Sequence, residues 1–295
     1  MDQPLVLALD AMGGDRAPGM VLKGLNIARK RYPNVNYILF GDENKVIPGL
    51  KKFPKLIQKC EIRHTSQVIS SNDKPSTALR RARDSSMRRA IDSVRNGEAQ
   101  GIVSAGNTGV LFVISKMILK MMNQVSKPAL AGLWPSKKGM SVVLDLGANI
   151  ECDEKNLVDF SEMGAALYKS IFPDQKPYVS LLNIGSEEIK GTEVLKKTYS
   201  KLKSLSNEKN FLFNGYIEGN NLMDGKTNVI VTDGFTGNIA LKTAEGTAKF
   251  VVDSLKESLS ENIFSKFSII FSYFSLKKFK SKLDPRKYNG AIFLG

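Results

Sequence analysis

The sequence predicts an α/β protein built on a largely parallel sheet. Short β-branched or apolar runs alternate with segments of helical periodicity, and most of the short runs end in polar or glycine-rich turns. A chain of 295 residues with 42% hydrophobic content buries a core without a disulfide or metal. We expect a single α/β domain over residues 1–295, without internal repeats or a flexible linker.

Strands and helices are expected to follow one another along the chain. The expected strands, which are apolar or β-branched, are Leu5–Leu9, Tyr37–Phe40, Gly101–Val103, Ser141–Leu146, Tyr178–Asn183 and Asn228–Thr232. The expected helices are Met20–Tyr32, Ala78–Arg95, Val110–Met122, Asn156–Ile171, Thr192–Leu205 and Ile239–Leu259. Ligands of open α/β sheets bind beyond the carboxyl ends of the strands, so the turns after these strands are the candidate sites.

The first strand ends in a turn with two adjacent glycines, which let backbone approach a ligand closely. Pro18 follows near a helix start, where its fixed φ is tolerated. The flanking aspartates are expected to orient hydrogen-bond donors, although a tight structural turn is the alternative. The candidate substrate-binding residues here are Asp10, Gly13, Gly14 and Asp15.

The segment 104–109 follows a strand and opens a helix, so that backbone N–H groups and the helix dipole converge on an anion. It matches neither the Walker pattern nor the three-glycine dinucleotide fingerprint, which argues against a nucleotide. An ordinary helix start capped by Asn107 or Thr108 is the alternative. The candidate phosphate-binding residues are Ser104, Gly106, Asn107, Thr108 and Gly109.

Three later turns, 145–149, 183–191 and 232–238, also combine small and polar residues. We expect Lys190 and Lys242 to neutralise phosphate and Glu187 or Glu188 to pair with Lys190; a solvated ion pair is the alternative. The candidate catalytic residues are Lys190, Asn149, Asn238, Asp233 and Lys242, and further substrate-binding candidates are Gly185, Glu187, Gly234, Thr236 and Gly237. If the sheet is parallel, all five turns fall on one edge and indicate a phosphate-handling cleft.

The net charge of +14 favours an acidic partner: nucleic acid, anionic membrane, a phosphorylated ligand or an acidic protein. A basic composition throughout the organism is the alternative. We expect no nucleic acid, because zinc-finger spacing, RNA-stacking motifs and a clear recognition helix are missing. Cys60 and Cys152 lie far apart without metal-ligand spacing, so we expect core thiols, a reducing cytosol and no metal.

The segment 262–283 is aromatic and basic. One helical face carries Ile263, Phe264, Phe267, Ile270, Phe271 and Phe274, and Lys277, Lys278, Lys280 and Lys282 follow. Serines and lysines interrupt it too often for a bilayer span, which takes about 20 apolar residues. We expect an amphipathic segment in peripheral contact with an anionic membrane; a core or dimer-interface helix is the alternative.

The five turns together, in order from residue 5 to residue 295, closely resemble the acyl carrier protein:phosphate acyltransferase family of bacterial phospholipid synthesis. Supporting similarities are Lys74-Pro75-Ser76, Ser85-Ser86-Met87, Ala240-Leu241-Lys242 and the closing Gly290-Ala291 with Leu294-Gly295. The resemblance implies a three-layer α/β/α fold of the isocitrate dehydrogenase and phosphotransacetylase type and a cytoplasmic, peripherally membrane-associated homodimer without an organic cofactor. It also implies transfer of a long-chain acyl group from acyl carrier protein to inorganic phosphate, with the acyl phosphate passed to a membrane glycerol-3-phosphate acyltransferase.

Two departures from the family pattern matter. Arg16 stands where the family usually has a histidine, and an arginine is no base at neutral pH. The family also continues for some tens of residues past the position that matches Gly295, with a further strand and helices, so we expect a chain without the family's carboxyl-terminal end. A fragment, a natural truncation and a reduced copy are the alternatives.

The chemistry requires a positioned phosphate and a stabilised oxyanion, and no strong base. His64, the only histidine, lies away from the glycine turns, and no Gly-x-Ser-x-Gly elbow is present, so we favour direct attack over an acyl-enzyme. Asn149 or Asn238 is expected to donate to the oxyanion. Acyl carrier protein is acidic, and the candidate docking residues are Arg80, Arg81, Arg83, Arg88 and Arg89, with a solvated helix face as the alternative. The competing functions are a phosphotransacetylase-like enzyme that uses acyl coenzyme A and a catalytically silent scaffold.

Overall fold

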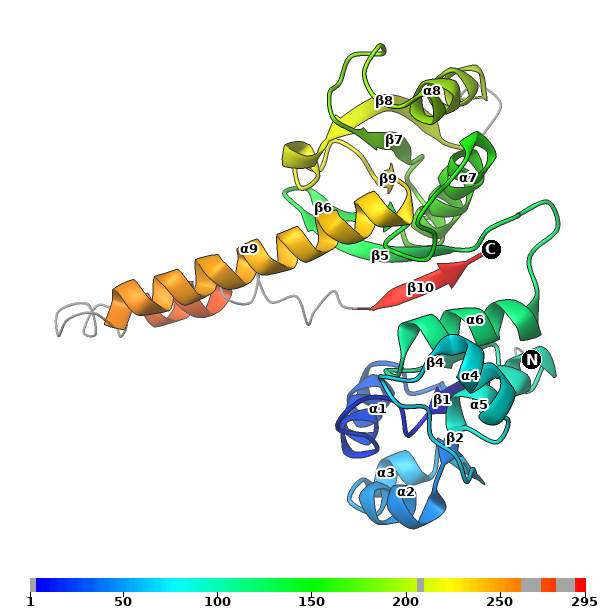
Figure 1. The fold of residues 1–295 in the computed structure, drawn as a ribbon. Coiled ribbons are helices and arrows are strands. Elements are labelled where there is room, and N and C mark those ends of the chain that lie inside the picture. Colours follow the sequence, from blue (N-terminus) through cyan, green and yellow to red (C-terminus); the bar gives the residue numbers. More distant parts are fainter. Residues whose placement is uncertain (1–3, 206–209, 261–271, 280–289) are drawn as a thin grey trace. The chain divides into compact units, whose positions relative to one another are not determined.

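A computed structural model describes residues 4–205, 210–260, 272–279 and 290–295. The chain folds into two compact units, Met1–Met121 and Met122–Gly295 (Figure 1). Each unit has its own sheet, which differs from the one sheet expected above. Two of the five candidate turns therefore belong to the first unit and three to the second.

The first unit is built on a parallel sheet with the strand order β3-β2-β1-β4. Its strands are β1 (Val6–Asp10), β2 (Asn36–Gly41), β3 (Cys60–His64) and β4 (Gly101–Val103). Its helices are α1 (Gly19–Arg31), α2 (Glu43–Leu50), α3 (Pro54–Ile57), α4 (Pro75–Arg81), α5 (Ser86–Arg95) and α6 (Thr108–Leu119).

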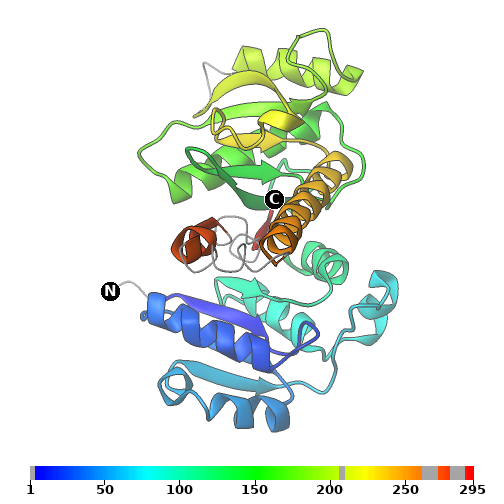
Figure 2. The same cartoon turned by 90° about the vertical axis from the view of Figure 1, so that its left-hand side faces the viewer.

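Successive side chains of a strand point to opposite faces, and this gives the first unit three layers. Leu9 and Leu39 pack with α1, α2 and α3 on one face of the sheet. Ala8 and Ile38 pack against Ala90 of α5 on the other face. Figures 1 and 2 show the helices on both sides of this sheet.

The second unit has a sheet with the order β10-β5-β6-β9-β7-β8. Strands β6 to β9 run parallel, and β5 pairs antiparallel with both β6 and β10. The strands are β5 (Ala129–Ser136), β6 (Gly139–Leu144), β7 (Tyr178–Asn183), β8 (Leu212–Glu218), β9 (Val229–Val231) and β10 (Ala291–Leu294). The helices are α7 (Glu154–Ile171), α8 (Glu193–Leu205) and α9 (Gly234–Ser260).

The second unit is also layered. Leu144 and Val231 pack with Phe160 of α7 on one face of its sheet. Val143 and Ile230 pack with Leu241 of α9 on the other. The expected α/β/α class with a largely parallel sheet is thus confirmed.

One expected helix is divided. The pattern over Ala78–Arg95 belongs to α4 and α5, which are separated by a short break. Ser85 explains the break, because its hydroxyl accepts a hydrogen bond from the Arg88 N–H at 3.2 Å and donates one to the Ala82 carbonyl at 2.8 Å. This is the behaviour of a serine at a helix N-cap.

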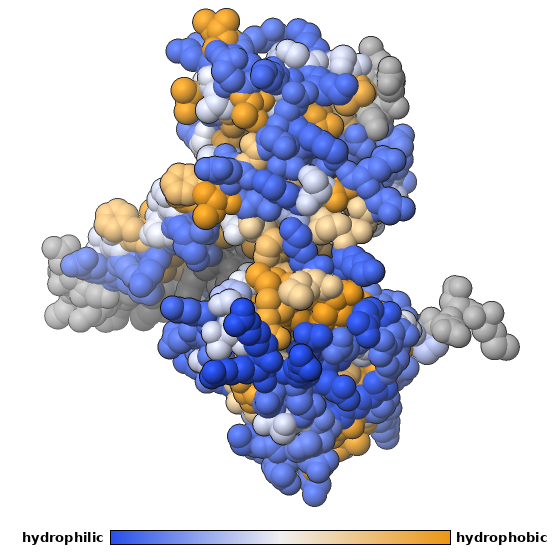
Figure 3. All heavy atoms as spheres, turned by 45° about the vertical axis from the view of Figure 1, so that its right-hand side comes forward, coloured by the Kyte–Doolittle hydropathy of each residue, from blue (hydrophilic) through white to orange (hydrophobic). Residues whose placement is uncertain are grey.

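The aromatic-basic segment 262–283 lies largely outside the described residues. Its described part, 272–279, is helical and exposes Tyr273 and Phe274. Figure 3 shows apolar side chains along α9 and a broader apolar patch on the first unit, with mostly hydrophilic surface elsewhere on that face. Among the described residues, no helix combines the length and apolar character that crossing a membrane requires.

Candidate functional site

In the first unit, Asp10 is the centre of a buried hydrogen-bond cluster at the carboxyl end of β1. Its Oδ1 accepts from the Ser86 hydroxyl at 2.6 Å, and its Oδ2 accepts from the Ser104 hydroxyl at 2.7 Å. The Met12 N–H also donates to Oδ1, at 3.2 Å. Hydrogen bonds to a carboxylate are short and strong, so Asp10 fixes the orientation of both hydroxyls. Ser86 was not predicted as a site residue.

The two glycine turns of the first unit lie against each other. A Cβ atom at Gly13 would be 2.5 Å from Asp10 Oδ2 and 2.8 Å from the Gly106 nitrogen, so no side chain fits there. Gly14 has a φ of +93°, which favours glycine. The Gly106 N–H donates to the Ser104 hydroxyl at 3.1 Å. The turns after β1 and β4 therefore form one structure at the edge of this sheet.

Asn107 is the N-cap of α6, which is the alternative that the sequence offered to a contact with phosphate. Its Oδ1 caps α6 by accepting from the Val110 N–H at 3.1 Å. Its Nδ2 donates to the Ser71 carbonyl at 2.9 Å and the Asp73 carbonyl at 3.1 Å. Both ends of the amide are thus engaged, and the side chain braces segment 70–73 instead of offering an N–H to phosphate. The free backbone N–H groups of the first helical turn, at Thr108 and Gly109, remain as anion donors.

Other predicted residues of the first unit lie at its surface. Asp15 accepts from the Ser71 hydroxyl at 3.2 Å, and Arg16 is exposed. His64 ends β3, where its Nδ1 accepts from the Glu43 N–H at 3.4 Å, far along the sheet from β4. Two of the five arginines proposed for carrier docking are paired, Arg88 with Asp92 and Arg89 with Asp84. The other three are exposed and form no ion pair with a described residue: Arg80, Arg81 and Arg83.

In the second unit, Asp145 holds the turn after β6. Its Oδ1 accepts from the backbone N–H groups of Leu130, Gly147 and Ala148 at 3.0 to 3.1 Å. Its Oδ2 accepts from both the backbone and the side-chain N–H of Asn149 at 2.8 Å. Asp145 is fully buried and was not predicted as a site residue, although an aspartate directly after an apolar strand was the available signal.

The two candidate oxyanion donors, Asn149 and Asn238, differ in whether their side-chain N–H groups are already hydrogen-bonded. Asn149 donates its Nδ2 hydrogens to the Pro128 carbonyl at 2.7 Å and to Asp145. That leaves Asn149 no side-chain N–H for an oxyanion, which corrects the expected role. Asn238 lies on α9 over Gly147, is exposed, and makes no side-chain hydrogen bond to a described residue. The structure therefore favours Asn238 as the donor.

The turn before α9 is packed directly onto the Asp145 turn. A Cβ atom at Gly237 would be 1.9 Å from the Asp145 carbonyl oxygen, and one at Gly234 would be 2.5 Å from the Asn149 carbonyl oxygen. Asp233 begins the helix by accepting from the Thr236 N–H and hydroxyl, both at 2.8 Å. Asp233 and Thr236 thus shape the helix start, and Asp233 contacts no lysine in the described part of the chain.

The loop 184–191 after β7 carries Lys190. The buried Asn183 holds its base by donating to the Lys190 carbonyl at 3.2 Å. Glu188 does not pair with Lys190 as one alternative expected; it accepts from the Tyr199 hydroxyl at 2.6 Å and from Lys203 Nζ at 2.9 Å, both on α8. Lys190 and Glu187 are exposed and form no ion pair with a described residue.

Gly185 and Lys242 complete the predicted set. A Cβ atom at Gly185 would be 2.7 Å from Glu187 Oε2, so glycine gives this loop its close turn. Lys242 is exposed and pairs with Glu245 at 2.9 Å. It lies one helical turn beyond Asn238, on the same face of α9.

The cysteines are partly buried and weakly acidic. Burial raises the pKa of the Cys60 thiol to about 12. Burial, with a smaller effect from the Asp145 carboxylate, raises the pKa of the Cys152 thiol to about 11. Thiolate is the nucleophilic form of cysteine, so neither side chain is poised for acyl transfer at neutral pH. The described residues also contain no group of three or more His, Cys, Asp or Glu side chains arranged to hold a metal.

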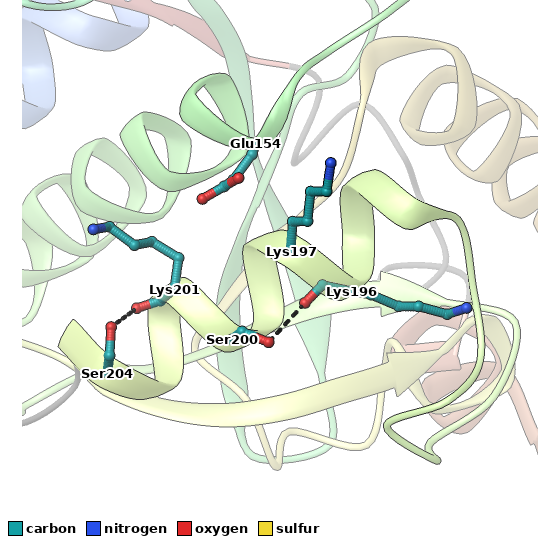
Figure 4. Close-up of a pocket in the computed structure, with 6 residues that line it drawn as sticks. All are labelled: Glu154, Lys196, Lys197, Ser200, Lys201 and Ser204. Carbon is teal, nitrogen blue, oxygen red and sulfur yellow. Dashed lines mark hydrogen bonds between the residues drawn. The ribbon is translucent and has the colours of Figure 1, made fainter.

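A lysine-rich depression of about 480 Å³ lies elsewhere on the second unit, between α8 and the start of α7 (Figure 4). Its three lysines are Lys196, Lys197 and Lys201. In Figure 4 their ammonium groups point away from one another, and Ser200 and Ser204 donate to backbone carbonyls of α8. The depression therefore does not gather its charges around one ligand.

Comparison with known proteins identifies relatives over the full chain. The family model described as fatty acid synthesis protein matches residues 5–295. A protein of Pelagibacter ubique named phosphate acyltransferase is 52% identical over 295 residues, covering 100% of this chain and 88% of that protein. A phosphate acyltransferase of Paramagnetospirillum magneticum is 45% identical, covering 100% of this chain and 84% of that protein.

Solved structures with the same fold are more distant in sequence. A phosphotransacetylase from Streptococcus pyogenes aligns with a TM-score of 0.62 at 16% identity, covering 83% of this chain and 82% of that one. The EutD phosphotransacetylase from Staphylococcus aureus aligns with a TM-score of 0.60 at 18% identity and the same coverage. At these identities the similarity establishes the fold, as the sequence analysis expected.

Proposed function

We propose that this chain, which belongs to the fatty acid synthesis protein family, transfers a long-chain fatty acyl group from acyl carrier protein to inorganic phosphate. The observation that carries the proposal is the full-length similarity to relatives named phosphate acyltransferase. That name supports phosphate as the acceptor. The carrier-protein donor and the use of the acyl phosphate in phospholipid synthesis are our finer proposals.

The phosphate contacts that we propose lie at the start of α6. The N–H groups of Thr108 and Gly109 have no partner within the helix, and they lie at the positive end of its dipole. The Ser104 hydroxyl gives its hydrogen to Asp10 and accepts from the Gly106 N–H, so it braces this turn and leaves the anion to the backbone N–H groups. Together they form a neutral anion site of the kind that helix starts provide, which suits a phosphate that must also remain reactive.

The chemistry that we propose is direct attack. A phosphate oxygen adds to the thioester carbonyl carbon, and the carbonyl oxygen becomes an oxyanion. The oxyanion then collapses, the C–S bond breaks, and the carrier leaves as a thiolate that takes a proton from solvent. Asn238 is proposed to donate to the oxyanion, and Lys190 and Lys242 to neutralise the developing charge. The raised thiol pKa values of both cysteines support direct attack over a cysteine-bound acyl intermediate.

The proposed function implies two partners, an acidic carrier protein and a membrane. Arg80, Arg81 and Arg83 are exposed without described ion pairs and are suited to an acidic carrier protein. We also propose a cytoplasmic homodimer in which the segment 262–283 contacts an anionic membrane and hands acyl phosphate to a membrane glycerol-3-phosphate acyltransferase. The exposed Phe274 and the lysines that follow it support the membrane contact.

Lys190→Ala and Asn238→Ala test these roles. Each is expected to lower the rate of acyl phosphate formation by about a hundredfold, because each removes a group that meets charge in the transition state. Lys169→Ala, which removes an exposed lysine of α7, is the matched control and should leave the rate unchanged. Rates within about twofold of the unmodified chain in both variants would show that these residues are not the charge-stabilising groups.

The donor is tested by comparing long-chain acyl carrier protein with acyl coenzyme A. A higher kcat/KM with the carrier supports the proposal. Preference for acyl coenzyme A would instead indicate a phosphotransacetylase-like enzyme, and turnover with neither donor would favour the scaffold.

A further inference from the structure

The second unit exposes large aliphatic side chains beside its polar turns. Among the described residues, the three most exposed aliphatic side chains of the large hydrophobic type are Ile184 (83% exposed), Ile189 (79%) and Ile150 (76%). All three lie in loops that follow the carboxyl ends of β6 and β7. Phe235 (59%) and Ile239 (52%), at the start of α9, follow the end of β9. We call these five residues the apolar rim.

The rim residues come from neighbouring strands. The strand order β6-β9-β7 pairs Leu144 with Val231 and Val231 with Leu181, so the three strands end side by side. The Gly234 N–H donates to the Asn149 carbonyl at 2.8 Å, which ties the loop of Ile150 to the helix start that carries Phe235. Single exposed apolar residues are normal in proteins, whereas a group on one edge marks a binding surface.

The loops that present the rim are held firmly. Glu188, between the two isoleucines of its loop, is bound by Tyr199 and Lys203 of α8. Asn183 holds the far end of that loop, where Gly191 takes a φ of +92°. The rim is therefore preorganised by polar contacts that leave its aliphatic side chains at the surface, which lowers the entropic cost of binding a ligand.

The residue types of the apolar rim indicate which class of ligand it binds. The rim lacks tyrosine, tryptophan and arginine, the residues that anchor most protein interfaces. The loop 184–191 carries Glu187 and Lys190, and its Glu188 is paired with Lys203, so the loop has no excess of positive charge to attract an anionic membrane surface. A flexible hydrocarbon chain needs only aliphatic contact, and Asn238 and Lys190 lie on the same edge to meet a polar head.

We infer that the apolar rim binds the fatty acyl chain of the donor. This inference rests on the proposed function and deepens it, because it assigns the selection of chain length to Ile184, Ile189 and their neighbours in the second unit. The rim holds the hydrocarbon next to the thioester, while the polar groups of the same edge face the carbonyl.

The test is the chain-length dependence of a double variant, Ile184→Asn with Ile189→Asn. The ratio of kcat/KM for a long-chain to a short-chain acyl donor is expected to fall by about tenfold or more, since aliphatic burial contributes only where the chain is long. Ile184→Leu with Ile189→Leu keeps the aliphatic surface and should keep the ratio. Ile27→Asn removes an exposed isoleucine of α1 in the first unit and should also keep it.

A second measurement keeps the inference separate from the proposed function. Binding of parinaric acid, a fluorescent long-chain fatty acid, is expected to weaken by about tenfold in the asparagine double variant, whether or not the chain turns over. If the unmodified chain forms no acyl phosphate from any donor, the proposed function fails. The binding test then still shows whether the apolar rim binds a hydrocarbon chain. Unchanged parinaric acid binding together with an unchanged chain-length ratio overturns the inference. The inference is also overturned if the asparagine double variant binds anionic vesicles more weakly but keeps its parinaric acid binding and its chain-length ratio.

Discussion

Two buried aspartates organise the candidate turns at the scale of single residues. Asp10 fixes two serine hydroxyls in the first unit, and Asp145 gathers backbone N–H groups in the second. Neither carboxylate is exposed enough to meet substrate freely. Their shared role is to position other groups, which the sequence analysis anticipated for Asp10 and missed for Asp145.

Asp145→Asn is predicted to destabilise the chain. The substitution places an NH₂ group against N–H donors, so at least one buried donor loses its acceptor at a cost of about 1–3 kcal/mol. Thermal unfolding should show a lower midpoint of several degrees. Asp174→Asn, at an exposed position after α7, is the control and should leave the midpoint unchanged. Equal midpoints for the two variants would mean that the Asp145 contacts are not needed for stability.

Gly237→Ala is predicted to be severe, because its Cβ atom would be 1.9 Å from the Asp145 carbonyl oxygen. The turn must move to admit the methyl group, and acyl phosphate formation should fall together with stability. Gly246→Ala is the matched control in the same helix, since nothing lies within 4 Å of its Cβ position. Removing a helical glycine there should stabilise α9 by about 0.5–1 kcal/mol. A benign Gly237→Ala variant would show that the two turns do not pack as described.

Sequence reasoning located the site turns but not every residue role. A small residue or an aspartate after an apolar run identifies a strand-end turn, and five such turns were found in this way. The cap formed by Asn107 was one of the expected alternatives. Its contacts with Ser71 and Asp73, and that of Asn149 with Pro128, were not predictable, because these partners are distant in sequence. Only tertiary structure shows which amide hydrogens are already used.

At the scale of elements, the tether between the loop 184–191 and α8 is the most specific feature. The hydrogen bond from Tyr199 to Glu188, followed by the contact with Lys203, holds the pKa of the Glu188 carboxyl below its usual value. Burial, followed by the Glu188 hydrogen bond, raises the pKa of Tyr199 to about 12. The tether is thus complete at neutral pH and joins the Lys190 loop to a helix.

Tyr199→Phe is predicted to loosen that loop while keeping the aromatic contacts with Phe213 and Tyr216. Hydrogen exchange of residues 184–191 should be faster in the variant near pH 7. The folded-state pKa of Glu188 is lowered, so its contribution is present above the ordinary carboxyl pKa and is lost as pH falls through the lowered value. The exchange difference should therefore disappear in strong acid. An equal exchange rate at neutral pH would count against the tether.

Element prediction succeeded where periodicity was strong and failed where it was interrupted. Gly101–Val103 and Tyr178–Asn183 match β4 and β7 in full. Strand β5 was missed because Gly132 and Pro135 interrupt its apolar run, and both are poor strand residues. The α4–α5 break was missed because the helical pattern continues through Ser85.

At the scale of the whole molecule, alternation of strands and helices was enough to predict the fold class. That alternation did not predict the two units, because the strands of two sheets of the same type follow one another in the sequence like the strands of one sheet. The junction at Met121 and Met122 lies between α6 and β5 and carries no Pro- or Gly-rich linker. The expected single edge for all five turns depended on one sheet, and it is replaced by two edges.

The whole chain is proposed to place the acyl group of its donor on inorganic phosphate. The most direct measurement incubates the purified chain with radiolabelled inorganic phosphate and long-chain acyl carrier protein, and follows the label into solvent-extractable material. We expect a labelled acyl phosphate that hydroxylamine destroys and that forms in step with the release of free carrier thiol. Release of carrier thiol and free fatty acid, with the label remaining in inorganic phosphate, would contradict it.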